Sequence, residues 1–561
     1  MKHQSPLRRR LSAAVAASAA LIVLGACGTS NDEASNASAT TSAVASLASL
    51  DDTHADTNDG EYDVDDATRI DLADGASSAS GSGADAVRTT GDLVTITAPG
   101  TYLLSGELTD GQVVVSSSAD GKVKLVLDGV SITSTTTSPL VVEESDETVV
   151  ILADGSTNTL ADTATARATD ESADESSDEE SDDPNATLFS RDDLTIAGTG
   201  TLRVAGNTND AITSKDGLVI LSGTIEVTSV DDGIRGKDYL VIEDGTITVD
   251  AQGDGLKADN ESTETSSGKA KELGWFQLDG GTVTIDAGDD GIDAEGALNV
   301  TAGELTIASS VEGLEARQIT LAGGTVDVTA SDDGLNATAG NGGEAVQDGV
   351  LLSLAGAEVT VAAGSDGIDS NGNAVLSGGS VTVHSAARGG GDGSIDVNGT
   401  FDITGGTLVA TGGLSGAPSA DSDQGWVVAS LETTVATGQQ LEVVDAEGTT
   451  VASHTATQET SSLIVSAPGI EAGATYTVRA GAAGELADVA TATANEYAGG
   501  FGGPGGGRPA GGPGGGSDSG PGGERPEGMG TPPEGWTPPD EMGTPPEDWT
   551  PPEGMEPPAR Q

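Results

Sequence analysis

The 561-residue chain is poor in cysteine, in aromatic residues and in basic residues. Its one cysteine excludes a disulfide framework and any zinc site built on several cysteines. Aromatic residues make up only 2% of the chain, so we do not expect a conventional enzyme core. The 23 basic residues stand against 90 acidic ones, for a formal net charge of −67. A chain this acidic repels phosphates, and we therefore expect no nucleic-acid partner.

Valine, isoleucine, leucine, alanine and threonine must supply the ordered part, with many of the 82 glycines at turns. That composition favours strands over helices, because branched side chains fit a pleated surface better than a helix. We therefore expect an all-β protein.

The N-terminal 26 residues are typical of a secretory signal peptide. A basic stretch, Lys2 and Arg8 to Arg10, precedes the uncharged, alanine-rich run 11–24, which is short for a membrane span. The sequence Leu-Gly-Ala-Cys at 24–27 resembles the lipidation motif of bacterial lipoproteins. We expect cleavage before Cys27, lipidation there, and a protein held by its lipid on the extracellular face of the bacterial membrane. An ordinary signal peptide or a short membrane helix is the alternative.

Three further segments have too little apolar content to form a packed core. Residues 27–85 are rich in Ser, Ala, Thr, Asp and Asn and are predicted to be a disordered tether. Residues 162–183, with ten acids and one base, are predicted to be a disordered insert between strand-like segments. Residues 498–561 form a Gly- and Pro-rich tail, predicted to be extended and disordered.

A repeated unit between residues 205 and 412 is the strongest signal in the chain. Each unit starts with an acid, mostly followed by Gly, then Ile or Leu, and continues into short strands that alternate apolar and polar residues. The starting acids are Asp210, Asp232, Asp254, Asp290, Glu312, Asp333 and Asp366, which are 22, 22, 36, 22, 21 and 33 residues apart. The two long steps contain insertions, roughly 261–273 and 340–348.

Units of about 22 residues with short strands predict a parallel β-helix, because no unit buries its apolar face alone and stacked units share one core. We expect a right-handed parallel β-helix over residues 86–415, with a small β cap over 424–480. The residues after each acid-Gly pair should form an inward aliphatic file, beginning with Ile212 and Ile234.

Stacked coils would place the repeated acids in one file, about 4.8 Å apart. Neighbouring carboxylates at that spacing repel by about 3.5 kcal/mol at an effective dielectric of about 20. Calcium would neutralise them, because it takes six to eight oxygen ligands in flexible geometry. The candidate metal ligands are Asp210, Asp231, Asp232, Asp254, Asp259, Asp289, Asp290, Asp293, Asp333 and Asp366. Ordinary Asp-Gly turn chemistry is the alternative for any single one of them.

A few bases and aromatic residues lie among these repeats. Lys215, Lys237, Lys257 and Arg235 fall at corners of adjacent coils, either as counter-charges to the acids or as contacts for anionic sugars. A lysine there could also act as a base. Trp275 and Phe276, after the first insertion, are the candidate contacts for a neutral sugar.

The corners at 231–234 and 289–292, together with Gly-Thr-Tyr-Leu-Leu-Ser-Gly at 100–106 and Phe-Ser-Arg-Asp-Asp-Leu-Thr-Ile at 189–196, resemble a known bacterial family. It is the cell-surface carbohydrate-binding parallel β-helix family described as binding cellulose and acidic sugars. The resemblance covers about 86–480 and implies a calcium-bearing β-helix similar in structure to pectate lyases. Glu312, at a position that is usually Asp, departs from the pattern.

Three functions remain open at this point. The first is a non-catalytic lipoprotein, acting as a monomer, that binds an acidic or cellulose-like polysaccharide and contacts the membrane through its lipid only. The second is a polysaccharide lyase of the pectate type, with calcium acidifying a proton and Lys or Arg as the base. The third is a structural or adhesive spacer of the cell wall.

Overall fold

The computed structural model describes residues 48–163, 183–260, 263–266, 269–340, 345–386 and 393–497, with backbone alone at 263–266 and 269–272. All of them belong to the first of two compact units, residues 1–506. The signal peptide with Cys27, residues 164–182 of the acidic insert, and the tail lie outside the described residues.

Strands dominate the described chain, and its two short 3-10 helices are η1 (Leu50–Asp52) and η2 (Ala84–Ala86). The strands before the acidic insert are β1 (Thr68–Leu72), β2 (Ser78–Ser80), β3 (Val87–Thr90), β4 (Leu93–Ile96), β5 (Gly100–Leu108), β6 (Gln112–Ser116), β7 (Lys122–Ser134), β8 (Leu140–Glu144), β9 (Glu147–Leu152) and β10 (Thr157–Asp162). Those from the insert to the first repeat insertion are β11 (Ala186–Ser190), β12 (Leu194–Gly198), β13 (Thr201–Gly206), β14 (Asp210–Ser214), β15 (Gly217–Ile220), β16 (Thr224–Ser229), β17 (Ile234–Gly236), β18 (Tyr239–Ile242), β19 (Thr246–Ala251) and β20 (Leu256–Ala258).

The repeats continue beyond a hairpin within the first insertion, formed by β21 (Thr263–Ser266) and β22 (Lys269–Glu272). The next strands are β23 (Trp275–Leu278), β24 (Thr282–Ala287), β25 (Ile292–Val300), β26 (Glu304–Ser309), β27 (Leu314–Leu321), β28 (Thr325–Thr329), β29 (Leu335–Ala337), β30 (Leu351–Leu354), β31 (Glu358–Ala363), β32 (Ile368–Ser370), β33 (Asn373–Leu376), β34 (Ser380–Ser385), β35 (Asp396–Val397), β36 (Phe401–Ile403) and β37 (Thr407–Thr411).

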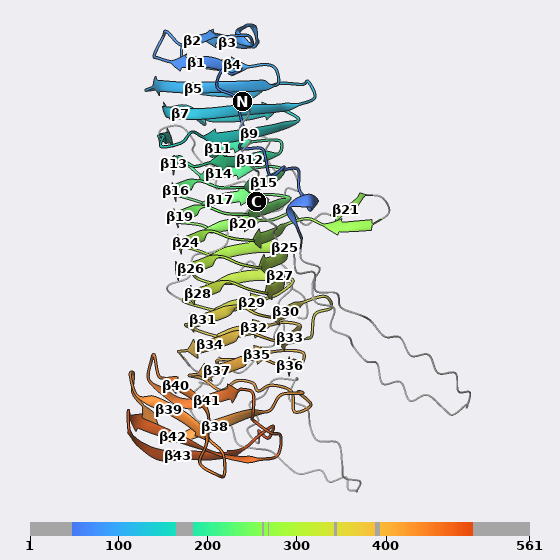
Figure 1. The fold of residues 1–561 in the computed structure, drawn as a ribbon, viewed down its shortest axis with the longest axis vertical. Coiled ribbons are helices and arrows are strands. Elements are labelled where there is room, and N and C mark those ends of the chain that lie inside the picture. The colour runs from blue at the N-terminus through green and yellow to red at the C-terminus, as the bar shows by residue number, and fades with distance from the viewer. Residues whose placement is uncertain are drawn as a thin grey trace, which may run out of the picture. The chain divides into compact units, whose positions relative to one another are not determined.

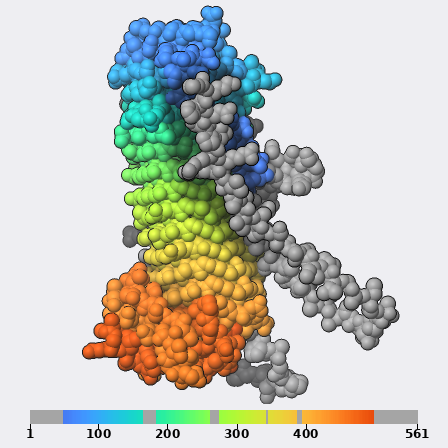
Figure 2. All heavy atoms as spheres, viewed as in Figure 1, coloured from blue at the N-terminus to red at the C-terminus, as the bar shows by residue number. Residues whose placement is uncertain are grey.

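The strands of successive repeats pair in parallel, one above another (Figure 1). β16, β19, β24, β26 and β28 form one such column, and β15, β18, β23, β25 and β27 form a second. A third column runs through β14, β17, β20, β25, β27, β29, β32 and β35. The described residues are therefore all-β with a large, mostly parallel sheet, which confirms that part of the prediction and is consistent with a β-helix. In Figure 2 the stacked repeats appear as successive bands from green to orange.

The core is the aliphatic file that the repeats predict. Ile212 pairs with Ile234, Ile234 with Leu256, and the pairing continues in the same way to Ile368. The file members are all fully buried, and burial of one such side chain contributes about 1.5 to 3 kcal/mol. The glycine after each acid has a packing reason beyond its turn, since a Cβ on Gly233 would lie 2.4 Å from the Gly255 carbonyl oxygen.

The tether prediction is wrong for residues 48–85. β1 pairs in parallel with β5, and its Ile70 is fully buried, so stacked strands begin at Thr68 rather than at residue 86. A segment of low apolar content is ordered here because its few apolar residues extend a core that the later strands already form. We call residues 48–62 the strap, because this segment lies along the outside of coils far from it in sequence.

The C-terminal strands are antiparallel and bury an apolar cluster of their own that includes Val427 and Val478. They are β38 (Trp426–Val435), β39 (Gln440–Val444), β40 (Thr450–Thr455), β41 (Thr460–Ser466), β42 (Thr475–Ala482) and β43 (Glu485–Thr493). β41 also pairs antiparallel with β37, the last strand of the parallel stack. Within the part of the chain that the structure describes, no helix has the length and apolar character needed to cross a membrane.

Candidate functional site

The starting acids of the repeats form one continuous file, which we call the acid file. Parallel pairing aligns the residues just after them. From Asp254 onward, each acid's carbonyl oxygen accepts a hydrogen bond from the glycine of the preceding repeat, as in Gly291 N–H to Glu312. Its members are Asp210, Asp232, Asp254, Asp290, Glu312, Asp333 and Asp366.

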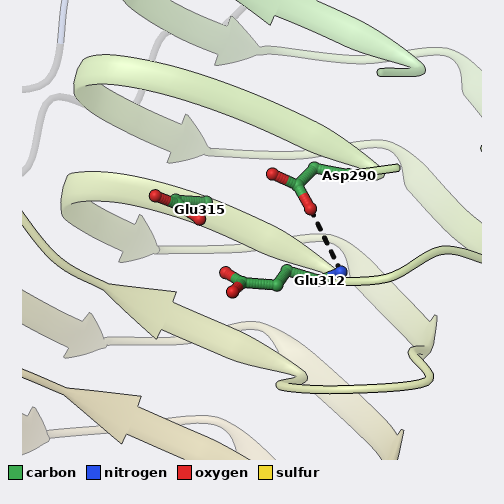
Figure 3. Close-up of side chains that lie close together, drawn as sticks. All are labelled: Asp290, Glu312 and Glu315. Carbon is green, nitrogen blue, oxygen red and sulfur yellow. Dashed lines mark hydrogen bonds between the residues drawn. The ribbon is translucent and has the colours of Figure 1, made fainter. Parts of the chain in front are cut away.

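Five of the seven side chains of the acid file accept a hydrogen bond from the backbone of the next repeat. Oδ1 of Asp290 accepts the N–H of Glu312 at 3.1 Å, as the dashed line in Figure 3 shows. The same contact joins Asp232 to Asp254 at 2.9 Å, Asp254 to Asp290 at 3.0 Å, Asp333 to Asp366 at 2.7 Å and Asp366 to Gly393 at 2.7 Å. This explains why an acid recurs at the corner, and it leaves Oδ2 of each aspartate for another partner.

A second file runs beside the acid file, three residues later in each repeat; we call it the mixed file. Its members, aligned by the strand register, are Thr213, Arg235, Lys257, Asp293, Glu315, Asn336, Asp369 and Asp396. The mixed file begins with neutral and basic residues and ends with acidic ones. The two files together therefore have a compensated N-terminal half and an acidic C-terminal half.

In the N-terminal half, lysine and arginine neutralise the acids. The Lys257 ammonium contacts the Asp254 carboxylate closely, Asp293 at 3.3 Å and Asp232 at 3.9 Å. Arg235 makes a bidentate contact with Asp259 at 3.0 and 2.5 Å. Burial alone would lower the pKa of Lys257, but the three surrounding carboxylates outweigh burial and raise it. Lys257 thus serves as the cation of this half.

In the C-terminal half, Asp290, Glu312 and Glu315 bring ligand oxygens within 4.8 Å of one another (Figure 3). The Asn336 amide donates to Glu312 at 2.5 Å and to Glu315 at 3.4 Å. Among the described residues, no lysine or arginine forms an ion pair with these three acids. This triad could hold a metal ion, and its hard oxygen ligands suit calcium.

The C-terminal carboxyls bind protons more tightly than ordinary ones. Burial, and then the charges of Asp254 and Glu312, raise the pKa of Asp290 to about 7. Burial, and then the acids of the neighbouring repeats, raise the pKa of Asp369 to about 8. Burial and the adjacent Glu312 carboxyl also raise the pKa of Glu315. In the absence of a cation, some of these carboxyl groups therefore stay protonated near neutral pH.

We expect the melting temperature in chelator to fall as the pH rises from about 5 to about 8.5. The folded-state pKa values of Asp290 and Asp369, about 7 and about 8, lie above their ordinary value of 3.8, so the folded state binds more protons than the unfolded chain. That stabilisation is complete below the unfolded pKa and is lost as the pH rises through the folded values. Thermal scans would check this, with Asp369→Asn as a variant whose slope is smaller. A melting temperature that rises over this range would contradict it.

The ten predicted metal ligands differ in their surroundings. Asp231 and Asp289 are exposed beside the acid file rather than in it. Asp259 is paired with Arg235, and Asp232, Asp254 and Asp293 surround the Lys257 ammonium, so these four already have a basic partner. Asp210 accepts from Thr213 and Asn185. Asp290 belongs to the triad, whereas Asp333 and Asp366 continue the file beyond it.

The predicted sugar contacts need larger corrections. Phe276 is fully buried in the core, because it alternates with the outward Trp275 on β23, and it cannot reach a glycan. Trp275 is 4% exposed, because it lies among Val219, Val241 and the strap residue Ala55. Lys257 aligns with Arg235 on the neighbouring repeat. Lys215 and Lys237 instead follow directly after the paired residues Ser214 and Gly236, two positions further along the repeat. Lys215, Lys237 and Lys257 therefore do not form one file.

Two side-chain clusters escaped the sequence reasoning, because the strap brings together residues far apart in the chain. His54 Nδ1 lies 2.7 Å from the Tyr239 hydroxyl and 3.0 Å from Asp193, and its Nε2 lies 2.9 Å from Thr195 Oγ1. The Lys122 ammonium contacts Asp59, Glu147 and Asp56 at 2.7, 2.7 and 3.2 Å. Glu312 and Glu315 could have been placed in the triad from the sequence, since they repeat the i, i+3 spacing of Asp290 and Asp293.

Comparison with known proteins gives three findings. Residues 90–346 match the family described as carbohydrate-binding domain-containing protein. A protein of that description from Acetivibrio thermocellus is 37% identical over 134 residues, 24% of this chain and 44% of the relative. The chain thus matches less than half the length of that relative. A solved structure entitled polysaccharide lyase-like protein from C. thermocellum, a gadolinium derivative, shows 31% identity over 43% of this chain and 91% of its own, with a TM-score of 0.38.

The matched range contains the triad and most of the acid and mixed files. The resemblance expected from the repeats is thus confirmed as a similarity: residues 90–346 of this chain are similar to carbohydrate-binding domain-containing proteins.

Proposed function

We propose that this protein is a non-catalytic binder of acidic polysaccharide that holds its ligand through calcium in the C-terminal half of the two files. The family match of residues 90–346 supports carbohydrate as the ligand. The observation that carries the proposal is the run of carboxylates at Asp290, Glu312, Glu315, Asp333 and Asp369, none of which has a basic ion-pair partner among the described residues.

Calcium links these carboxylates to an anionic sugar. The triad offers carboxylate oxygens as ligands. Asp290 Oδ1 already accepts a backbone N–H, and one oxygen of Glu312 and one of Glu315 accept from the Asn336 amide. Calcium needs six to eight oxygens, so sugar carboxylates, hydroxyls and water can complete its shell. Without the cation, the acidic surface would repel a uronate polymer.

The surroundings of Lys257 favour binding over lyase chemistry. A general base must be unprotonated near neutral pH to remove the carbon-bound proton. Three carboxylates raise the pKa of Lys257 and hold its ammonium, so this lysine stays protonated. We therefore assign Lys257 a neutralising role rather than a catalytic one.

We expect calcium-dependent retardation of the full-length protein in a gel that contains polygalacturonate. Lys237→Ala and Lys257→Ala should each weaken binding, because they remove positive charge from the corners that carry the acid file, whereas Arg203 lies in another strand column. Arg203→Ala is the matched control, since Arg203 is exposed on β13 and paired with Glu226.

The same samples separate this proposal from its alternatives. An increase in the absorbance of unsaturated uronates that one lysine substitution abolishes would favour the lyase function. Equal migration with calcium and with chelator would exclude calcium-dependent binding and favour a structural spacer.

The proposal also covers anchoring and the finer architecture. We propose that Cys27 carries a lipid that holds the protein at the extracellular face of the bacterial membrane, and that the parallel stack is a right-handed β-helix of about 22-residue coils capped by β38–β43. Cys27→Ala is expected to move the protein from the detergent-extracted membrane fraction to the soluble fraction. Immunoblots of both fractions check this, and an unchanged membrane fraction would contradict lipidation.

A further inference from the structure

β18, β23 and the last four residues of β25 and β27 share an outward face without charged side chains. The inward residues of these strands, such as Leu240, Phe276 and Leu298, belong to the core. On β18, on β23 and on the last four residues of β25 and β27 (297–300 and 318–321) the outward ones are uncharged; they are Tyr239, Val241, Trp275, Gln277, Ala297, Asn299, Gln318 and Thr320. The earlier parts of β25 and β27 carry the charged residues Asp293, Glu295, Glu315 and Arg317 and are not part of this face. We call this surface the Tyr-Trp face. An uncharged surface is suited to a ligand without charge.

Aromatic stacking marks one end of the Tyr-Trp face. Tyr239 and Trp275 pair on adjacent repeats, and their rings stack with centroids 5.0 Å apart and an interplanar angle of 22°. The alanine that follows, Ala297, is a small residue in the same column, one repeat below Trp275. A large flat apolar surface next to a small residue leaves a place where a sugar ring can lie against an aromatic one.

A polar ladder runs beside the aromatic pair. Gln277 aligns with Asn299, and Asn299 with Thr320, on three successive repeats. All three side chains are 1% exposed, yet Gln277 Oε1, Asn299 Oδ1 and Thr320 Oγ1 have no hydrogen-bond partner within the described part of the chain. A buried polar atom without a partner is costly, by about 1–3 kcal/mol, so this ladder is suited to a ligand that carries regularly spaced hydroxyl groups.

The strap covers the aromatic end of this face. Ala48 O accepts from Gln277 Nε2 at 2.9 Å, and Ala55 and Leu50 pack in the cluster that contains Tyr239 and Trp275. In Figure 1 this segment, coloured blue, lies beside the green strands instead of the blue ones. The strap lies outside residues 90–346, whereas the whole Tyr-Trp face lies inside them.

We propose that the Tyr-Trp face is a second glycan-binding site, for an uncharged polysaccharide chain, and that strap residues 48–55 occupy it when no glycan is bound. The face provides stacking on Trp275 and hydrogen bonds from Gln277, Asn299 and Thr320. This second site rests on the proposed function for its class of ligand, polysaccharide, but it uses neither calcium nor the acid file.

Opening the strap tests this site. The double substitution Leu50→Asp and Ala55→Asp places charges in the apolar contact, and His54→Ala removes the bonds to Tyr239 and Thr195. We expect both variants to bind hydroxyethylcellulose about tenfold or more tighter than the wild type, because a ligand competing with a closed strap loses affinity in proportion to the closed population. Adding Trp275→Ala to either variant should remove that gain.

Calcium-dependent binding of polygalacturonate by the same variants shows that they are folded and separates the two sites. Folded variants that bind hydroxyethylcellulose no more tightly than the wild type would overturn the second site and leave the first intact. Hydrogen exchange on the unmodified full chain needs no substitution. Saturating hydroxyethylcellulose should accelerate amide exchange at 48–55, and unchanged exchange there would also overturn the proposal.

Discussion

Lys257→Met is expected to lower the free energy of unfolding by about 3 kcal/mol or more at pH 8, because removing one partner of a buried ion pair leaves the opposite charges uncompensated. Here three carboxylates lose their common cation: Asp254, in close contact, Asp293 at 3.3 Å and Asp232 at 3.9 Å. Methionine keeps much of the side-chain length, so packing changes little. Urea unfolding at fixed calcium, followed by circular dichroism, would measure the loss.

Arg203→Met is the matched control. Arg203 pairs with Glu226 at 2.8 Å, but the two side chains are 51% and 45% exposed. Exposed pairs contribute about 0–1 kcal/mol, so this variant should unfold close to the wild type. Equal effects of the two substitutions would show that Lys257 is not the neutralising cation of its half.

The effect of Lys257→Met should also shrink when calcium is added. The three carboxylates that surround the ammonium have the chemistry that calcium prefers, and the variant vacates the space between them. A larger calcium-induced rise in melting temperature for Lys257→Met than for the wild type would therefore show that lysine and calcium are interchangeable in this file.

The parallel stack could be predicted from the sequence because its determinants are local and repeated. One acid, one glycine and one aliphatic residue recur at each corner, and every copy confirms the same register, as in Ile212–Ile234 and Leu335–Ile368. The acid file follows from that register alone. Its division into two halves could not be read so directly, because it depends on which long side chain, Lys257 or Glu315, points toward the file.

The strap and the aromatic residues could not be predicted for the opposite reason. His54 contacts Tyr239, which is 185 residues away in the chain, and no repeated pattern in the sequence indicates that contact. The exposure of Trp275 was overestimated because its cover comes from a segment that composition alone marks as a tether. Phe276 was wrongly predicted to contact a sugar, because adjacent side chains of β23 point to opposite faces and Phe276 points into the core.

Calcium at a hundredfold excess over its dissociation constant is expected to raise the stability of the wild-type protein by about 2.7 kcal/mol for each site it fills. The double substitution Glu312→Gln and Glu315→Gln should remove the contribution of the triad. In chelator the same variant should melt at a higher temperature than the wild type. Glutamine carries no charge, so the burial and mutual repulsion of the two carboxylates no longer destabilise the folded state. The variant is thus expected to be more stable than the wild type without calcium and to gain less from it.

Glu358→Gln is the control for these opposite effects in calcium and in chelator, since Glu358 is an exposed glutamate on β31, outside both files. It removes one negative charge without touching the triad, so its response to calcium should equal that of the wild type. Thermal scans in calcium and in chelator, with elemental analysis of the dialysed protein, would measure both effects. A double variant that responds to calcium as fully as the wild type would move the ion away from the triad. A wild-type protein that binds no calcium, and melts identically in chelator, would leave protonation as the means by which the C-terminal half limits its own repulsion.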